Sequence, residues 1–309
     1  MDSTAQAVWL FRFHEGITHE RQLIGVSVAP HWEVRPYAIA NEDRMIQQMS
    51  DLRAWLLGLP ARGQYTFTTA EAREQQPGVR AAATTAALGR AETAGLIVRP
   101  VRGFHVIVPL EDRGVGTPAW RLFLAPLMEY LELAYYVGLL AAAAHHGASP
   151  QAAQVVQVVV PRQRRTIEVG RGRIEFVVNR DIAKAPVELV NAPAGRYRIA
   201  TPELTALDLV RYSARAGGWG NVVTVLRDLA PALRPSRFRP VLATEPSVAD
   251  VVRLGYLLDW LEAPDAAAPL HRWMAERPER WVPLVPGAGR AGIRNPRWRI
   301  VINEAIEPD

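Results

Sequence analysis

Residues 79–108 read VRAAATTAALGRAETAGLIVRPVRGFHVIV, and this stretch decides the fold of the N-terminal part of the chain. Residues 79–94 are rich in alanine, the best helix former, and carry Leu88 as a large apolar anchor. Gly95 follows where a left-handed helix cap is favoured. The remaining residues are two apolar runs on either side of the turn 100–103. We therefore predict a helix followed by a β-hairpin.

The residues before this stretch complete a helix-turn-helix pattern. Apolar residues recur every three or four positions over 46–59, which predicts a helix that ends near Gly58. Residues 65–67 alternate like a strand, and Thr69 is placed to cap a short helix. Helix, strand, short helix, turn, helix and hairpin is the order of elements in a winged helix-turn-helix. We predict this DNA-binding fold for residues 45–110.

The longer helix has an outer face that suits a DNA groove. With Leu88 toward the core, Thr85 and Glu92 lie near that side, Arg90 points away and Arg80 sits at the edge. A small, basic face is what a helix needs in a major groove about 12 Å wide. On the hairpin, phosphate or minor-groove contacts are expected from Arg99, Arg102 and His105. The alternative is a surface helix of a module that binds no DNA.

Charge and composition agree with contact to nucleic acid. The 309 residues include 36 basic ones, of which Lys184 is the only lysine, against 31 acidic ones, for a net charge of +5. Positive charge concentrates in 51–110, with net +3, and in 161–200, with net +5. Concentrated positive charge favours nucleic-acid binding, although a GC-rich genome also yields many arginines.

Several classes of protein are excluded or disfavoured by composition. The absence of cysteine excludes disulfides and thiolate metal sites, which points to the reducing cytoplasm. The longest apolar run, Tyr135–Ala144, is about half the length of a membrane span, so no contact with a membrane is expected. Residues 1–44 show no sustained period and stay unassigned. Either translation begins at Met45 or Met49, or this segment is a short arm.

The second half of the chain predicts a mixed α/β domain. Residues 111–118 are polar and rich in turn formers, so we predict a linker there and a C-terminal domain over 119–309. Residues 120–133 and 135–146 are predicted helices, the second of them buried. The apolar runs 155–160 and 174–178 predict strands. The overall class is therefore α+β, a winged helix-turn-helix followed by a larger mixed domain.

Two further features lie in this domain. The arginine-rich residues Arg162, Arg164 and Arg165 between the strands indicate either a solvated hairpin edge or a contact with RNA, DNA or an acidic protein. Thr201, Pro202 and Glu203 form a helix start, with a cap, a proline in the first turn and an acid at the positive end of the helix dipole. Further helices are predicted at 219–230 and 247–262, and a closing strand at 298–302.

No arrangement of residues indicates catalysis. His145 and His146 are adjacent, so on a helix they point about 100° apart and cannot chelate one ion. There is no Walker loop and no G-x-S-x-G motif, and Lys184 does not fit the spacing of a carboxylate nuclease. We therefore expect no enzyme, no metal and no cofactor. The alternative is a C-terminal enzyme that handles nucleotides or phosphates and is recruited by the winged helix.

Two blocks carry a resemblance to a known family. They are YYVGLLAAAAHHGASPQAAQVVQVVVPRQRR from Tyr135 and YRIATPELTALDLVRYSARAGGWGNVVTVLRDLA from Tyr197. The chain resembles the AbiEi antitoxins of type IV toxin–antitoxin and phage abortive-infection systems. The helix from Leu254 and the terminal NPRWRIVIN from Asn295 are also similar to the family's C-terminal end, so the resemblance covers about 45–309. Ala200 stands where the family has a small polar residue.

The resemblance implies two separable roles. An N-terminal winged helix would repress the chain's own operon by binding inverted repeats in its promoter, as a monomer in solution that binds cooperatively on DNA. A C-terminal domain would counteract a nucleotidyltransferase-like toxin from the same operon, with or without direct contact. By position, the implied operator contacts are Arg80, Thr84, Thr85, Arg90, Arg99 and Arg102. The candidate antitoxin surface comprises Arg162, Arg164, Arg165, Thr201, Glu203, Asp208 and Arg211. A structural pair is the alternative for Asp208 and Arg211, which lie three apart on one helix.

Overall fold

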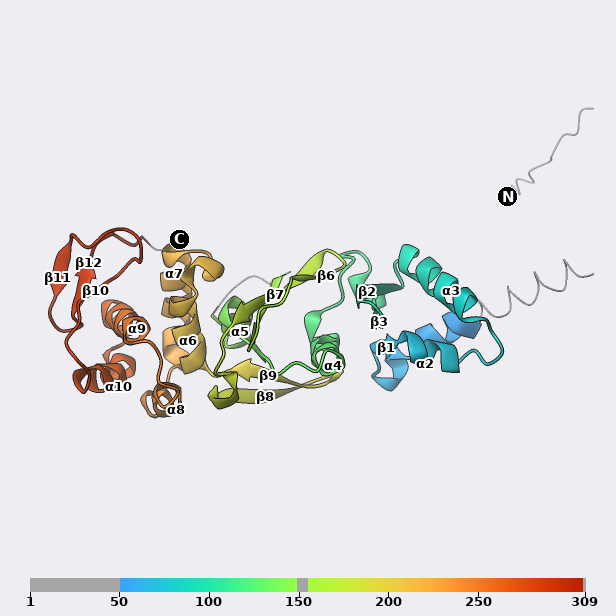
Figure 1. Ribbon diagram of the computed structural model, residues 1–309, viewed down its shortest axis with the longest axis horizontal. Coiled ribbons are helices and arrows are strands. Elements are labelled where there is room, and N and C mark those ends of the chain that lie inside the picture. Colours follow the sequence, from blue (N-terminus) through green and yellow to red (C-terminus); the bar gives the residue numbers. More distant parts are fainter. Residues whose placement is uncertain (1–50, 149–154, 308–309) are drawn as a thin grey trace, which may run out of the picture. The chain divides into compact units, whose positions relative to one another are not determined.

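The computed structural model describes residues 51–148 and 155–307 (Figure 1). The initial segment and the choice of start site therefore lie outside the described residues. The described chain mixes α-helices with β-sheets, as the sequence predicted. Within it, no helix is both long and apolar enough to cross a lipid bilayer.

The N-terminal part has the predicted order of elements. Residues 51–58 are helical, and the hairpin strands pair antiparallel, with the sheet order β1-β3-β2. An apolar core of Leu52, Leu56, Phe67, Leu88 and Ile97 joins the helices to this sheet. The elements are η1 (Pro60–Arg62), β1 (Thr66–Thr68), α2 (Thr69–Glu74), α3 (Ala81–Thr93), β2 (Ile97–Val101) and β3 (Phe104–Ile107).

Two local predictions in this part are corrected. The cap of α2 is Thr68 and not Thr69, because Thr68 Oγ1 accepts the Glu71 N–H while the Glu71 carboxylate accepts the Thr68 N–H. In α3 the side chain that shares the core face with Leu88 is Thr84, and Thr85 is exposed. Residues four apart lie on one helix face, so the predicted rotation was off by one residue.

The central sheet has six strands in the order β6-β7-β5-β4-β9-β8. The pairs β5–β7 and β4–β9 are parallel, whereas the central pair β4–β5 and the edge pairs β6–β7 and β8–β9 are antiparallel. The strands are β4 (Tyr136–Val137), β5 (Val155–Val160), β6 (Ile167–Val169), β7 (Gly172–Val178), β8 (Val187–Ala192) and β9 (Gly195–Ala200). Helices α4 (Leu124–Tyr130) and α5 (Leu139–His145) and the turns η2 (Leu110–Asp112), η3 (Trp120–Leu122) and η4 (Ile182–Lys184) accompany the sheet.

The single helix predicted over 135–146 is wrong. Tyr136 and Val137 instead form β4, paired with Val159 and Val158, and only then does α5 begin. A short apolar run has no periodicity that separates a buried strand from a buried helix. The partner strand, which lies further along the chain beyond α5, decides the outcome here.

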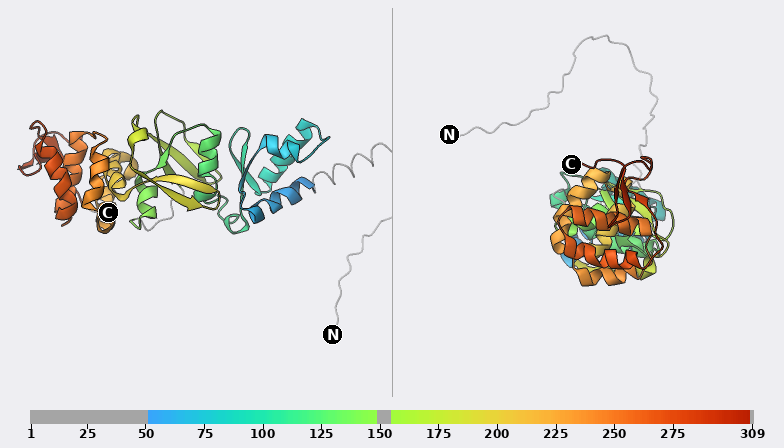
Figure 2. Two further views of the ribbon diagram at one scale, coloured as in Figure 1. Left: turned by 90° about the horizontal axis from the view of Figure 1, so that it is seen from below. Right: turned by 90° about the vertical axis from the view of Figure 1, so that its left-hand side faces the viewer.

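The C-terminal part is mainly helical. The predicted start at Thr201 is confirmed, since Thr201 Oγ1 accepts the Leu204 N–H and Pro202 is the first helical residue. The helices are α6 (Pro202–Arg211), α7 (Trp219–Leu229), α8 (Phe238–Leu242), α9 (Val248–Trp260) and α10 (Pro264–Ala275), with turns η5 (Ser213–Ala216), η6 (Ala230–Ala232) and η7 (Pro235–Arg237). A small sheet β10-β12-β11 follows, made of β10 (Val282–Pro283), β11 (Ile293–Asn295) and β12 (Ile300–Ile302). Helices α9 and α10 lie side by side (Figure 1, and Figure 2, left).

Candidate functional site

The outer face of α3 is small and basic. Its exposed residues include Thr85, Ala86, Gly89 and Arg90, and Arg80 stands at its N-terminal cap. No ion pair joins Arg80 or Arg90 to a carboxylate within residues 51–148 and 155–307. The helix therefore presents two guanidinium groups beside a surface without bulky side chains, which allows its backbone to approach another molecule closely.

Two residues predicted to touch DNA lie inside the protein. Thr84 is only 1% exposed, because it shares the core face of α3 with Leu88. His105 is 4% exposed and stacks on Phe67 at a ring distance of 5.0 Å, while its Nε2 lies 3.0 Å from Thr69 Oγ1. Burial, and secondly Arg99, lower the pKa of His105 to about 4, so this imidazole is neutral at neutral pH. Thr84 and His105 thus cannot contact DNA in this conformation.

The other hairpin residues are exposed. The Arg99 side chain reaches solvent, with its Nε 3.8 Å from Glu92 at the surface. The Arg102 side chain is also exposed, but its carbonyl oxygen accepts a hydrogen bond from Tyr130 of α4 at 3.1 Å. Both arginine side chains can therefore contact a phosphate, whereas the Arg102 backbone carbonyl is already hydrogen-bonded to α4.

A buried polar network crosses the C-terminal part. Tyr136 Oη on β4 donates to Asp208 Oδ2 at 2.9 Å, and Arg211 Nη1 lies 4.0 Å from Asp208 Oδ1. Arg211 Nε in turn donates to Asp250 of α9 at 3.3 Å, and Asp250 lies 3.5 Å from Arg253. The network therefore ties the central sheet to α6 and α9.

The electrostatics of this network follow from burial. Loss of solvent raises the pKa of Asp208 to about 7, and the nearby Arg211 and the Tyr136 hydroxyl oppose that rise only in part. Burial, and then the carboxyl of Asp208, raise the pKa of Tyr136 well above its usual value. The Arg253 Nε–H donates to the carbonyls of Pro283 and Leu284, both at 3.1 Å. Within the described residues, Asp208 Oδ1 is buried and accepts no hydrogen bond, and Arg211 Nη1 at 4.0 Å is its nearest ionic neighbour.

The structure separates the predicted antitoxin residues into two groups. Glu203 and Asp208 are fully buried and are not surface residues; Glu203 accepts the backbone N–H of Arg234 at 2.8 Å. Thr201 is the half-buried cap of α6, and Arg211 belongs to the buried network. Helix α6 is enclosed by its neighbours on all sides, which its apolar spacing alone did not reveal.

The second group is the arginine loop, residues 161–166 between β5 and β6. It exposes Arg162 and Arg165 and half-exposes Arg164. In the described part of the chain, none of these three arginines forms an ion pair. This loop is a cationic surface available to a partner.

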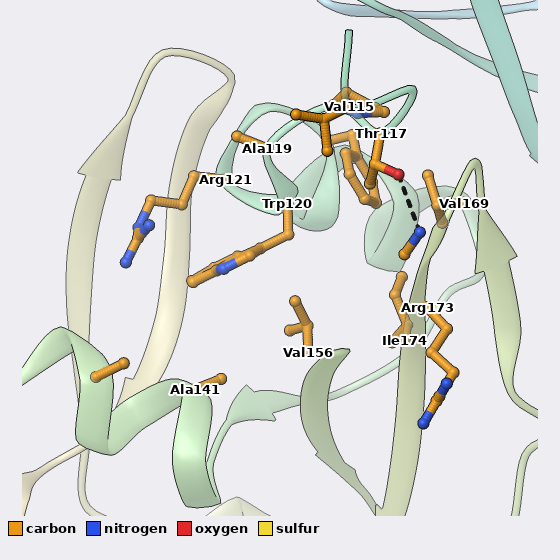
Figure 3. Close-up of a pocket in the computed structure, with 14 residues that line it drawn as sticks. Val115, Thr117, Ala119, Trp120, Arg121, Ala141, Val156, Val169, Arg173 and Ile174 are labelled. Carbon is orange, nitrogen blue, oxygen red and sulfur yellow. Dashed lines mark hydrogen bonds between the residues drawn. The ribbon is translucent and has the colours of Figure 1, made fainter. Parts of the chain in front are cut away.

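Sequence reasoning missed a pocket of about 230 Å³ (Figure 3). Its walls are mostly apolar side chains from segments that are distant in the sequence, such as Val115, Ala141, Val156 and Ile174. No local sequence pattern therefore predicts this pocket. Thr117 Oγ1, a polar group of the wall, already accepts the backbone N–H groups of 171 and 172.

The cations at the rim of this pocket are engaged elsewhere. Figure 3 shows Arg121 and Arg173 extending away from the space between Trp120 and Val156. The Arg121 guanidinium lies 4.5 Å from the centre of the Trp120 ring, and Arg173 Nε binds Glu175 at 2.8 Å. The pocket thus offers an apolar space without polar groups arranged to select a ligand. Among the described side chains, no group of three or more His, Asp or Glu could hold a metal ion.

Residues 136–260 match the family of the AbiEi antitoxin C-terminal domain. Among solved structures, the chain is similar to the crystal structure of the RV2827C protein from Mycobacterium tuberculosis, with a TM-score of 0.58 and 17% identity over 82% of this chain and 91% of that one. At this identity the likeness concerns the fold alone. No protein of curated function matches the sequence.

Proposed function

Since residues 136–260 make this chain a member of the AbiEi antitoxin family, an antitoxin of a toxin–antitoxin system, we propose that it also represses its own promoter. Residues 45–110 would act as the winged helix-turn-helix that binds inverted repeats in that promoter. The chain would be a monomer in solution and bind its operator cooperatively, in the cytoplasm. It would use no cofactor and catalyse no reaction.

The observation that carries this proposal is the outer face of α3. Its small side chains let the helix enter a major groove, and Arg80 and Arg90 are placed to meet phosphates or base edges. Thr85 stands between them on the exposed surface. The exposed Arg99 and Arg102 of the hairpin add salt-dependent attraction to the DNA backbone.

The C-terminal part would neutralise a nucleotidyltransferase-like toxin encoded in the same operon, as in type IV systems that abort phage infection. The surface that supports direct contact is the arginine loop, because its three cations form no ion pair in the described chain and reach solvent. Of the candidate antitoxin residues, Arg162, Arg164 and Arg165 are therefore the ones that we propose to act on the toxin. Thr201, Glu203, Asp208 and Arg211 support the domain from inside.

Binding of the full chain to its own promoter, with scrambled DNA as a control, tests the repressor role. Specific binding should exceed non-specific binding by about 10³-fold or more at physiological salt. Arg90→Gln should weaken promoter binding and lower the salt slope by about one, because one phosphate contact is lost. Arg227→Gln removes the same charge from an exposed position on α7 and should change neither value. Equal binding to both DNAs would contradict the proposal.

Co-expression with the neighbouring gene tests the antitoxin role. Wild-type chain should restore growth of cells that express the toxin. The triple variant Arg162→Gln, Arg164→Gln and Arg165→Gln should fold normally and fail to restore growth. Full protection by this variant would remove the arginine loop from the mechanism.

The alternative of a nucleotide- or phosphate-handling enzyme makes a different prediction. A ligand at about 100 times its dissociation constant would stabilise the protein by about 2.7 kcal/mol. Thermal unfolding in the presence of nucleotides and divalent ions would reveal it, and an unchanged melting temperature would favour the antitoxin without catalytic chemistry.

A further inference from the structure

The sheet of the N-terminal part is covered on both faces. On β3, Ile107 packs into the N-terminal core with Phe67, and His105 stacks on Phe67. Phe104 and Val106, which point to the opposite face, belong to the large core that continues through α4 and the central sheet. Both are at most 3% exposed. The outer face of such a sheet is commonly solvated, so its burial here marks a contact between the DNA-reading part and the antitoxin part.

Tyr130 of α4 lies at the edge of this contact and holds the hairpin turn, residues 101–104. Its hydroxyl donates to the Arg102 carbonyl at 3.1 Å, and its ring lies 5.2 Å from that of Phe104. Gly103 has φ +84°, and a Cβ atom there would come within 2.7 Å of Tyr130 Oη. A side chain at position 103 would therefore have to displace the Tyr130 hydroxyl from the turn.

The same turn holds the helix-turn-helix from its other side. The Gly103 carbonyl accepts the backbone N–H of Thr69, the first residue of α2, at 2.9 Å. The Thr69 hydroxyl contacts His105 of β3, and α2 packs against α3. A continuous set of contacts thus runs from Tyr130 through the turn and α2 to the DNA-reading helix.

We propose that Tyr130 is a positioning residue for DNA recognition: it fixes the hairpin turn and, through α2, the orientation of α3. This inference rests on the proposed function, since it assumes that α3 reads the promoter. It departs from fully separable roles, because a residue of the C-terminal part would then set the specificity of the N-terminal part. Non-specific attraction depends on charge and should be unaffected.

A double-mutant cycle on the full chain tests the proposal. Gly103→Ala should lower promoter affinity about tenfold in the wild-type background, because the new methyl group meets Tyr130 Oη and strains the turn. In the Tyr130→Phe background Oη is gone, and the next nearest atom, Cζ, lies at an ordinary 3.8 Å. There the same substitution should cost at most about threefold, which is the backbone strain alone. Affinity for scrambled DNA should stay constant in all four proteins.

Two controls keep the cycle interpretable. Gly95→Ala introduces a methyl group at a similar φ of +68° with nothing within 4 Å, so it measures the backbone strain without the contact. Tyr130→Phe by itself removes one exposed hydrogen bond, which should leave thermal unfolding nearly unchanged while lowering promoter affinity about fivefold. This second variant tests the proposal even if Gly103→Ala fails to fold.

Three outcomes are distinguishable. The positioning role is supported if Gly103→Ala lowers promoter affinity more in the wild-type background than in the Tyr130→Phe background. Affinity for scrambled DNA should show no such difference. Equal effects in the two backgrounds, or wild-type affinity of Tyr130→Phe, overturn it while the repressor function stands. If the wild-type chain shows no preference for its promoter, the proposed function fails, and the positioning role fails with it.

Discussion

Replacement of Asp208 by asparagine should change how stability depends on pH. Asp208 is fully buried, accepts a hydrogen bond from Tyr136, and has a pKa raised by burial from 3.8 to about 7. Between these two pKa values the folded chain keeps a proton on this carboxyl and the unfolded chain does not. Folding stability from this group is therefore complete below about pH 4 and is lost as the pH rises toward 7.

The magnitude follows from the size of the shift. Each pKa unit corresponds to about 1.4 kcal/mol, so a rise of about three units amounts to about 4 kcal/mol in total. Asparagine has a similar shape, and its amide oxygen can still accept a hydrogen bond from the Tyr136 hydroxyl, but it cannot ionise. The free energy of unfolding of wild type, measured relative to Asp208→Asn, should fall by about 1.4 kcal/mol per pH unit between about pH 4 and 7 and level off above that.

Urea unfolding of both proteins at several pH values from about 4.5 to 8.5 measures this difference. The absolute stability of Asp208→Asn can be lower by about 1–3 kcal/mol, because its amide faces Arg211 without an acceptor. Only the pH dependence is diagnostic. Asp228→Asn, an exposed position on α7, should run parallel to wild type. If Asp208→Asn also runs parallel to wild type, Asp208 is ionised in the folded chain and the reasoning is refuted.

Three other predictions concern stability. Gly255→Ala should destabilise the chain by about 3 kcal/mol in urea unfolding, because a Cβ atom there overlaps the buried ring of Trp298. An unfolding midpoint equal to that of wild type would mean that α9 and Trp298 separate readily. Gly89→Ala, in open space within α3, should instead stabilise by about 0.5–1 kcal/mol, and a loss would show that a neighbour occupies this face. His105→Gln should reduce the acid sensitivity of the chain. The folded pKa of His105, about 4, lies below the unfolded 6.5, so its contribution to the stability of wild type falls by up to about 3 kcal/mol as the pH falls from about 7 to 4. Equal acid sensitivity of both proteins would contradict the neutral imidazole.

The N-terminal elements could be predicted because their signals are local. Helix caps, the glycine after α3 and the hairpin turn, which lies at 101–104, one residue beyond the predicted 100–103, act through hydrogen bonds and backbone angles within a few residues. The start of α6 at Thr201 and Pro202 was predictable for the same reason. A single sequence carries such signals in full, so these elements and the mixed α/β class followed from it.

Tertiary contacts decided the rest, because they join residues far apart in the chain. Strand β4 exists because β5 pairs with it, and Asp208 is buried beside Tyr136, which lies 72 residues away. The rotation of α3 that buries Thr84 likewise depends on which surfaces meet. The same holds for the contact between Tyr130 and the hairpin turn, which lies 28 residues away. The sequence by itself determined the local elements and the cationic segments. The burial of a polar side chain, and hence its pKa and its role, depends on neighbours that only the folded chain supplies.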